Sequence, residues 1–469
     1  MRSGGRLVAA ILGLAGVACL VLGLRGSGAG TGTGTESATP EDRSAEATAL
    51  WSPRRVPGPF VDAVGVAQLQ ARLAEIAAGT ESCYRVEIDR LGVVADNAGA
   101  PVIPASTEKL MTAAGALDTL GPDLTFVTEA VASETPNGGT IDRLWLVGGG
   151  DPVLSTPSWI RTLADRPVYA RLTASLTPLA TLADDIVAAG VREIPGGVVG
   201  DGTRYATPAY LSSWPESYRA EIGPLGALVV DDGFDPATGS PVSDPALAAA
   251  DALGQLLVER GVTVGSATTG PAPSGAAVVA TVRSAPLDAL LTTMLSASDN
   301  GTAELLALAV DVAAGGSGTT EGGIAEILRR LAALGVDTTG VSLADASGLS
   351  RENRATCLAL LQTLQLGARP ELRTVVDGAA IAAERGTLRG RFVDTALAGR
   401  LYGKTGSLNG VAGLIALVDP SGGAGSPRFA SVFNGSFGDG TGIGLTTAVA
   451  EAAAAFPQSP SPSELVPAP

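Results

Sequence analysis

The apolar residues of the chain change their spacing several times, and these changes outline helices and strands. Apolar residues three or four positions apart predict helices at 69–76, from Pro104 onward, and at 285–295, 302–313, 324–334, 354–366, 375–384 and 442–455. Strand-like runs occur at 83–88 and 92–103, with a turn at Asp96-Asn97, and at 398–404, 411–419 and 427–435. Strands near both ends with helices between them favour an α+β domain, in which the two halves of the chain build one sheet.

The middle of the chain follows a different pattern. It is rich in Gly, Pro and short Val runs, with a hairpin turn expected at Pro136–Gly139 and helices near 177–190 and 246–260. We therefore predict an inserted mixed α/β domain at 128–282. The sheet domain then comprises residues 61–127 and 283–456.

The N-terminus has the pattern of an export signal. Arg2 and Arg6 precede an uncharged apolar run, Leu7–Leu24, without a clear A-x-A cleavage site. Residues 1–24 are therefore a signal peptide or, because the run reaches the lower limit for a membrane span, an anchor. Cys19 lies inside this run and lacks the surroundings of a lipoprotein cysteine. We expect an extracytoplasmic protein, either free in the cell envelope or attached to the membrane by this segment.

Two further segments lack the composition of folded structure. Residues 25–60 consist largely of Gly, Thr, Ser, Ala and Pro with scattered charges, and residues 457–469 are rich in Pro and Ser. Such segments bury too little apolar surface to offset the entropy lost on ordering. We predict a disordered linker and a disordered tail.

Charge and composition exclude several functions. The 469 residues carry 31 Lys and Arg, 47 Asp and Glu and no histidine, which gives a net charge of −16. A negative chain is repelled by phosphate backbones, so we expect no nucleic-acid partner. Without histidine there is no Ser-His-Asp triad and no histidine-based metal site, and we expect no metal or cofactor. Cys83 and Cys357 either pair in an oxidising compartment or stay free.

The basic residues are divided unevenly, since Lys109 and Lys404 are the two lysines and all others are arginine. Codon bias toward arginine explains the general pattern. The two remaining lysines are informative because Lys can lose its proton within a protein, whereas Arg cannot. Both lysines fall within short motifs that also contain serine.

The first motif is Ser106-Thr107-Glu108-Lys109, at the start of the helix opened by Pro104. Positions i and i+3 share one face of a helix, so the Ser106 hydroxyl and the Lys109 amine can meet. A neutral lysine can accept the serine proton if its pKa is lowered. On its own the motif is weak, because a serine at a helix start is usually a cap.

The second motif is Ser298-Asp299-Asn300, between two predicted helices. The hydroxyl of Ser298 can relay a proton, and the amide of Asn300 can hold a substrate carbonyl. The same three residues are also common in turns and helix caps.

The third motif is Lys404-Thr405-Gly406, followed by Ser407, at the end of a predicted strand. It offers a cation, two hydroxyls and a glycine that lets a ligand approach the backbone. Alone it is equally compatible with an exposed turn.

Together, and in this order, the three motifs are the signature of penicillin-binding proteins and class A β-lactamases. The sequence most resembles the D-alanyl-D-alanine carboxypeptidase/endopeptidase family of class C low-molecular-mass penicillin-binding proteins. The resemblance covers about residues 66–456 and is carried by the stretches 104–117, 146–155, 296–306, 345–356 and 403–418. The distance between the first two motifs leaves room for the inserted domain, which class A β-lactamases lack.

This resemblance implies a transpeptidase-like antiparallel sheet flanked by helices, and a serine-type carboxypeptidase acting on peptidoglycan stem peptides. Ser106 would be the nucleophile, Lys109 the general base, and Ser298 with Lys404 the relay to the leaving amine. Asn300 would hold the peptide amide. The terminal carboxylate would be bound by Lys404, Thr405 and Ser407 around Gly406, with the N–H groups of Ser106 and Ser407 as oxyanion hole. β-Lactam antibiotics would acylate Ser106.

Two other classes of function use the same motifs. A secreted β-lactamase needs a glutamate to deacylate quickly, and no convincing glutamate motif lies between Ser106 and Ser298. A catalytically silent peptidoglycan-binding protein would not need intact motifs. Whether cross-link endopeptidase activity accompanies carboxypeptidase activity stays open.

Several other residues have a structural interpretation. Gly148–Pro152 is expected to be a tight turn rather than a phosphate loop. Residues 345–353 are expected to form a loop with a helix cap near the site. The aromatic residues Tyr205, Trp214 and Tyr218 are interpreted as packing residues rather than sugar-binding platforms.

Overall fold

The structure is a computed structural model, and it describes residues 58–88, 92–420 and 426–456. The described residues belong to one compact unit. The predictions of an export segment, of the linker up to residue 57 and of a disordered tail concern residues outside these ranges. None of the described helices is long and apolar enough to cross a membrane.

The larger sheet joins the two ends of the described chain. Its six strands follow the order β12-β13-β14-β15-β1-β2 and pair antiparallel throughout. β1 pairs with β15 along its whole length, from Glu81 opposite Asn434 to Ile88 opposite Pro427. The strands are β1 (Glu81–Ile88), β2 (Gly92–Asp96), β12 (Ala380–Ile381), β13 (Leu401–Leu408), β14 (Val411–Val418) and β15 (Pro427–Asn434). The expected α+β fold with an antiparallel sheet is confirmed.

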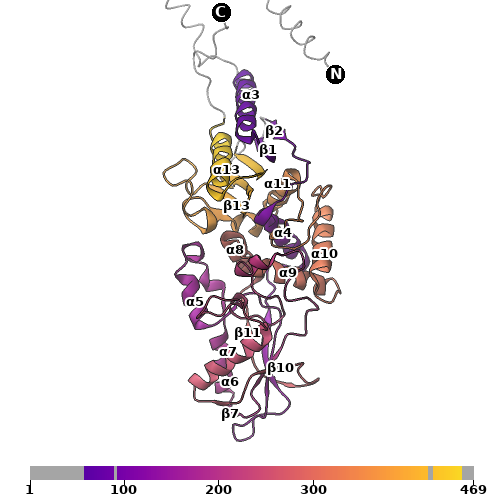
Figure 1. Ribbon diagram of the computed structural model, residues 1–469, viewed down its shortest axis with the longest axis vertical. Coiled ribbons are helices and arrows are strands. Elements are labelled where there is room, and N and C mark those ends of the chain that lie inside the picture. The colour runs from indigo at the N-terminus through magenta and orange to yellow at the C-terminus, as the bar shows by residue number, and fades with distance from the viewer. Residues whose placement is uncertain (1–57, 89–91, 421–425, 457–469) are drawn as a thin grey trace, which may run out of the picture. The chain divides into compact units, whose positions relative to one another are not determined.

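Both faces of this sheet are covered, because successive side chains of a strand point to opposite faces. On β14, Leu414 packs in one apolar cluster with residues of α3 and α13. Ile415 packs in a second apolar cluster with residues of α4, α8, α9, α10 and α11. Figure 1 shows α3 and α13 together beside the strands of this sheet. The helices are α3 (Gly58–Ala77), α4 (Lys109–Leu120), α8 (Leu287–Ala297), α9 (Asn300–Ala313), α10 (Thr320–Ala333), α11 (Cys357–Gln365) and α13 (Asp439–Ala454).

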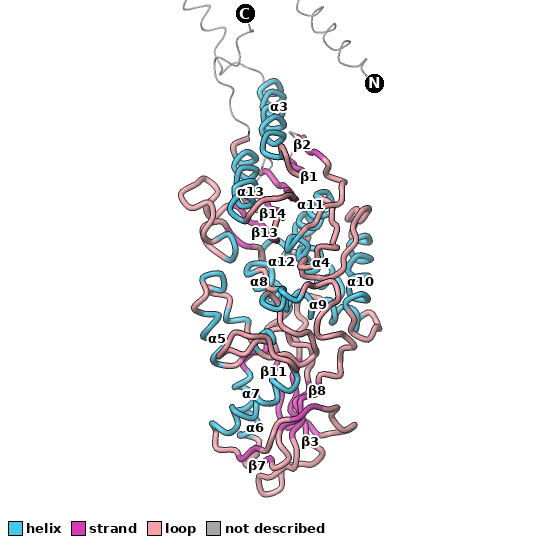
Figure 2. The backbone as a smooth tube through the Cα atoms, viewed as in Figure 1, coloured by secondary structure: helices cyan, strands magenta, loops and turns pink. Residues whose placement is uncertain are grey.

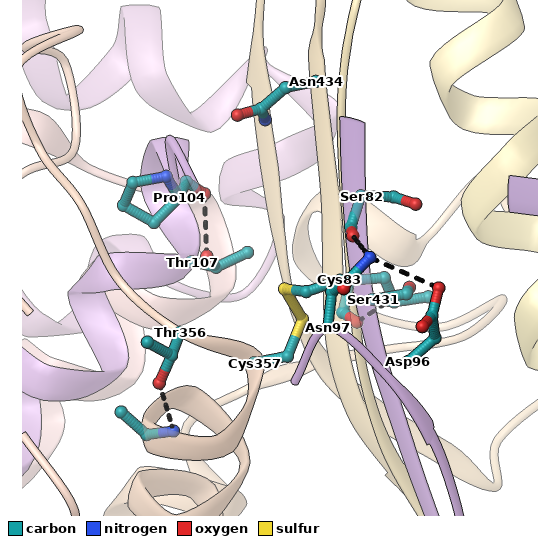
Figure 3. The surroundings of a disulfide bond; sticks show 12 residues. Ser82, Cys83, Asp96, Asn97, Pro104, Thr107, Thr356, Cys357, Ser431 and Asn434 are labelled. Carbon is teal, nitrogen blue, oxygen red and sulfur yellow. Dashed lines mark hydrogen bonds between the residues drawn. A yellow bond between two sulfur atoms is a disulfide. The ribbon is translucent and has the colours of Figure 1, made fainter. Parts of the chain in front are cut away.

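A disulfide joins the sheet to the helical layer. Cys83 of β1 and Cys357 at the start of α11 are bonded and fully buried (Figure 3). Thr356 caps α11 through its hydroxyl, which accepts the N–H of Ala359. The open question about these two cysteines is therefore settled in favour of pairing.

The middle of the chain builds a second, mixed sheet, separate from the first (Figure 2). β3 and β4 form the expected hairpin, with Asn137 and Thr140 paired across its turn. β4, β8 and β10 are parallel, and α5 (Pro157–Ala164), α6 (Leu179–Ala188) and α7 (Pro245–Glu259) follow strands of this region. The five strands are β3 (Val127–Ala132), β4 (Leu144–Val147), β8 (Val198–Asp201), β10 (Thr268–Thr269) and β11 (Ala277–Arg283). Two short parallel pairs complete the region: β5 (Leu154–Ser155) with β6 (Thr177–Pro178), and β7 (Glu193–Ile194) with β9 (Thr263–Val264).

The inserted region shares apolar contacts with the helices of the sheet domain. Tyr205 and Trp214 are buried in a cluster that also contains Leu305 and Leu308 of α9. The hydroxyl of Ser175 bonds that of Thr293 in α8 at 2.7 Å. The interpretation of Tyr205 and Trp214 as packing residues is confirmed, and their partners lie beside the candidate active site.

Several sequence-based boundaries differ from those of the structure. The helix expected at 375–384 is a single turn, α12 (Thr374–Asp377), because Ala380–Ile381 pairs with β13 as an edge strand. The turn expected at Asp96-Asn97 is confirmed, because β2 ends at Asp96 and Asn97 has a positive φ of 49°, but the strand expected to continue to residue 103 does not resume as a strand after it. α3 begins at Gly58, before the expected start of the domain. In the first two cases the register of a neighbouring strand or a local turn overrides the apolar spacing.

Candidate active site

Ser106 lies in a short turn that is tightly enclosed by backbone. The 3₁₀ turn Ala105–Glu108 opens α4, and Ala105 has a positive φ of 48°, which is strained for a residue with a side chain. The hydroxyl of Thr107 donates to the Pro104 carbonyl at 2.7 Å (Figure 3). A Cβ added at Gly406 of β13 would lie 2.8 Å from that carbonyl oxygen. Gly406 therefore lets the strand approach the serine turn, whereas the sequence suggested that it serves a ligand.

Lys109 is fully buried and its amine faces three oxygen atoms. Nζ lies 3.0 Å from Ser106 Oγ and donates to Asn300 Oδ1 at 2.7 Å and to the Ser347 carbonyl at 2.5 Å. The side chain thus joins the first motif to the second motif and to the loop that contains Ser347. Ser347 was not singled out from the sequence, because it acts here through a backbone carbonyl, which any residue carries.

Ser298 and Lys404 form a second pair of the same kind. Ser298 ends α8 with a left-handed φ of 65°, and Lys404 Nζ donates to its hydroxyl at 2.7 Å. Lys404 also donates to the Thr405 carbonyl at 2.8 Å and is fully buried. The structure therefore brings all three motifs together, although they lie far apart in the sequence.

The second motif, Ser298-Asp299-Asn300 (the SDN motif), also contacts the inserted region. Asp299 caps α9 by accepting the N–H of Thr302 at 2.7 Å, as its turn-like sequence suggested, and accepts the hydroxyl of Tyr169 at 2.8 Å. Asn300 Nδ2 donates to the Glu221 carbonyl at 2.9 Å. Neither contact was foreseen, because both reach across more than 75 residues of sequence.

The third motif lies in the middle of β13 rather than at the end of a strand, since β13 runs from Leu401 to Leu408. β12 pairs with β13 only at Tyr402 and Gly403, so among the described strands none pairs with this edge of β13 from Lys404 onward. Thr405 Oγ1 donates to Thr387 Oγ1 at 2.8 Å, and the exposed Ser407 donates to Asp439 at 3.4 Å. Both hydroxyls come from the same face of the strand.

Burial shifts the proton affinities of the site. Burial lowers the pKa of Lys109 to about 8, and nearby carboxylates partly oppose that shift. Burial, followed by the positive charge of Lys109, lowers the pKa of Lys404 well below its usual value. Burial also raises the pKa of Glu304 to about 8 and that of Glu108 well above its usual range. A lowered lysine pKa beside a serine hydroxyl suits nucleophilic catalysis.

A cavity adjoins the SDN motif on the side of the inserted region. Its volume is about 260 Å³, and it is bounded by Ser298–Gly301 together with Trp159, Arg166, Tyr169 and Asp232 of the inserted region. Burial raises the pKa of Asp232 well above its usual range. A ligand that reaches Ser298 from this side therefore meets residues from both parts of the chain.

The fold and the paired serine–lysine geometry define a class of serine acyl-transfer enzymes with the architecture of penicillin-binding proteins. The sequence profile of the D-Ala-D-Ala carboxypeptidase 3 (S13) family matches residues 68–241 and 235–454. The chain therefore belongs to this family, and it is a D-Ala-D-Ala carboxypeptidase.

Individual relatives agree with this assignment. A carboxypeptidase of Mycobacterium tuberculosis is 34% identical over 333 residues, which are 69% of each chain. The D-alanyl-D-alanine carboxypeptidase of Actinomadura sp. (strain R39) is 29% identical over 423 residues, 72% of this chain and 74% of that protein. Penicillin-binding protein 4 of Haemophilus influenzae has the same fold, with a TM-score of 0.68 at 20% identity over 81% of this chain and 98% of that one.

Proposed function

We propose that Ser106 is the nucleophile and Lys109 its general base in the cleavage of D-Ala-D-Ala at the end of peptidoglycan stem peptides. The distance of 3.0 Å between Lys109 Nζ and Ser106 Oγ carries this proposal. A base must lie within hydrogen-bond reach of the proton it accepts. The lowered pKa of Lys109, about 8, provides a neutral fraction near neutral pH.

In the first half-reaction the Ser106 proton passes to Lys109 as Oγ bonds to the carbonyl carbon of the penultimate D-Ala. The C–N bond to the terminal D-Ala then breaks, and the proton taken up by Lys109 passes to the leaving amine through Ser298, which Lys404 contacts at 2.7 Å, so that Lys109 is neutral again. In the second half-reaction water attacks the acyl carbon, Lys109 accepts a proton from it, and that proton returns to Ser106 Oγ as the ester bond breaks. The products are a shortened peptide carboxylate and free Ser106. The N–H groups of Ser106 and Ser407 serve as oxyanion hole.

The open edge of β13 supports the assignment of the substrate-binding residues. An extended peptide can pair with a strand that has a free edge. Asn300, whose Oδ1 accepts from Lys109 at 2.7 Å, is assigned to hold the peptide amide. Lys404, Thr405 and Ser407, around Gly406, provide one cation and two hydroxyls for the terminal carboxylate. We assign these residues to substrate binding.

We further propose that the protein works outside the cytoplasmic membrane. The Arg2–Leu24 segment has the pattern of an export signal or anchor. The Cys83–Cys357 disulfide is in keeping with an oxidising compartment, where such bonds persist. Protease added to intact spheroplasts should digest the protein, and full protection without lysis would contradict this localisation.

β-Lactams are proposed as inhibitors that acylate Ser106, because they mimic the D-Ala-D-Ala peptide. Penicillin-binding protein 4 of Haemophilus influenzae, which shares the fold, has been solved in complex with a β-lactam. A fluorescent penicillin should label the protein and persist for minutes, whereas Ser106→Ala should not be labelled. Rapid loss of the label would favour a β-lactamase, and no labelling of the wild type would favour a silent binding protein.

The substrate itself is tested by digestion of defined stem pentapeptides and cross-linked dimers, with products identified by mass. Release of one D-Ala from the pentapeptide is the expected result. Cleavage of the dimers would add endopeptidase activity to the assignment. Absence of both, in protein that penicillin still labels, would contradict the proposed substrate but not the nucleophile.

A further inference from the structure

The loop Asp345–Ser350 forms one wall of the Lys109 site. The Ser347 carbonyl accepts from Lys109 Nζ at 2.5 Å, and the neighbouring Ala346 carbonyl accepts the hydroxyl of Thr112 at 2.7 Å. Gly348 has a φ of 82°, and a Cβ there would lie 2.1 Å from the Ala105 carbonyl oxygen. The loop is therefore pressed against the turn that carries Ser106, with no room for displacement toward it.

Glu304 of α9 binds the backbone of this loop. It is fully buried, and its Oε1 accepts the N–H groups of Ala346 at 3.0 Å and Ser347 at 2.8 Å. The second of these N–H groups belongs to the residue whose carbonyl holds Lys109. Oε2 of Glu304 has no hydrogen-bond partner among the described residues. One oxygen atom of this side chain thus makes both contacts.

A tryptophan of the inserted region holds the other end of the loop. The indole N–H of Trp214 donates to Asp345 Oδ2 at 2.7 Å, while Asp345 Oδ1 accepts the N–H of Gly348 at 2.8 Å and Nδ2 of Asn353 at 2.7 Å. Trp214 is 8% exposed and Asp345 is fully buried. A hydrogen bond to a buried acceptor is costly to remove, because the acceptor then stays unpaired away from water.

We propose that Glu304 and Trp214 are positioning residues for Lys109, which fix the Asp345–Ser350 loop so that the Ser347 carbonyl holds the amine beside Ser106. Through Trp214 the inserted region thereby supports acyl transfer, although Trp214 itself does not contact the substrate. This inference rests on the proposed role of Lys109 as base.

Loosening the loop has a predictable effect on the pH dependence. The charged groups that shift the pKa of Lys109 are Asp345, Asp299, Glu304 and Glu108, and Lys109 in turn lowers the pKa of the neighbouring Lys404. Burial is the largest cause of the lowered pKa of Lys109, ahead of all of these charges. A loop that moves away takes Asp345 and the Ser347 carbonyl from Lys109, which favours the neutral amine, but it also admits water to the ammonium group. Because burial outweighs the opposing charges, the net effect is a raised pKa of Lys109. The rising limb of the acylation profile then moves to higher pH.

The test compares Trp214→Phe, Glu304→Gln and Glu304→Leu with the wild type. The measured quantities are the second-order rate of acylation by a fluorescent penicillin across pH, and the melting temperature. Trp214→Phe and Glu304→Leu should lose roughly ten- to hundredfold in rate, with the profile moved to higher pH, as expected for a misplaced reacting group. Glu304→Gln keeps the accepting oxygen and should restore most of the rate. Trp145→Phe, in β4 of the inserted region, is the control and should acylate as the wild type does.

Two results would overturn the inference. One is an unchanged rate and profile in Trp214→Phe and Glu304→Leu, even if their melting temperatures fall, because the residues would then serve stability alone. The other is equal loss in Glu304→Gln and Glu304→Leu, which would assign the effect to charge rather than to the hydrogen bonds. If Trp214→Phe does not fold, the two Glu304 variants decide. Lys109→Arg is measured in parallel: full activity there would contradict the role of the base itself, independently of the loop.

Discussion

Lys109 and Lys404 are both buried and each is hydrogen-bonded to a serine, but their electrostatic surroundings differ. Lys109 contacts Ser106, Asn300 and the Ser347 carbonyl, and four carboxyl groups raise its pKa against the effect of burial. Lys404 contacts Ser298 and its neighbouring carbonyl, and among the described groups only Lys109 is found to shift its pKa by charge. That shift is downward.

The difference in surroundings is in keeping with the two different tasks proposed for these lysines. Carboxyl groups around a buried lysine already stabilise its charged form. A buried lysine without such groups is stabilised most in its charged form when an anion binds beside it. A carboxylate bound beside Lys404 favours the charged form of Lys404 and, through repulsion, the neutral form of Lys109. The substrate carboxylate would thus help to prepare the base that attacks its own peptide bond.

The largest expected effect is that of Lys109→Arg. The substitution keeps the positive charge but removes the ability to act as a base near neutral pH. Acylation by penicillin should fall by about 10²–10⁴-fold, the usual contribution of a general base. The second-order rate of labelling measures this. A small loss would mean that the lysine pattern reflects codon bias alone.

Lys404→Arg should have a smaller effect, since part of the task proposed for Lys404 is electrostatic. The guanidinium still pairs with a carboxylate, although its fork places the charge differently. A loss of about ten- to hundredfold is expected, corresponding to one charged contact of roughly 1.5–3 kcal/mol. Comparison of the two variants under identical conditions is the measurement. Losses of equal size would remove the distinction between the two lysines.

The rate of acylation in the wild type should rise with pH, because only the neutral form of Lys109 accepts a proton. With the pKa of Lys109 at about 8, the rate should increase nearly tenfold per pH unit well below that value and level off above it. In Lys404→Arg the neighbouring charge is permanent, so the profile should move to lower pH. A profile that falls between neutral pH and pH of about 8 would contradict a lysine base.

The smallest effect is expected from Glu108→Gln. Burial raises the pKa of Glu108 well above its usual range, which favours the neutral form of the side chain, and glutamine resembles that form in shape and charge. The acylation rate should stay within about threefold of the wild type, a change of roughly 0.6 kcal/mol. A displacement of the profile to lower pH would show instead that an ionised Glu108 supports the charge on Lys109.

Much of the fold follows from apolar spacing, because long helices and the three strands near the C-terminus repeat their pattern clearly. The helices near 177–190, 246–260 and 285–295 match α6, α7 and α8. The edge strand β12 could not be found in this way. Its two residues, Ala380 and Ile381, lie in a run with helical spacing and are extended only because β13 offers them partners.

The three motifs could be found because their chemistry resides in side chains at fixed spacing. The residues that support the loop beside Lys109 could not be found from the sequence. Glu304 and Trp214 act on a loop through bonds that span 42 and 131 residues of sequence. Ser347 acts through its backbone carbonyl and Gly348 through the absence of a side chain. The short stretch Asp345–Ser350 was recognised as a loop near the site, but its partners depend on the folded arrangement.

The disulfide described above turns a large part of this chain into a covalent ring. It joins residues 274 positions apart, so Ser106, Lys109, Ser298 and the whole inserted region lie inside the ring, while Lys404 lies outside it. A single proteolytic cut in a loop of the inserted region would open the ring without releasing a fragment. Such a nicked molecule would migrate as one chain until reduced and as two afterwards, with the two serine motifs still tethered to each other through β1 and α11.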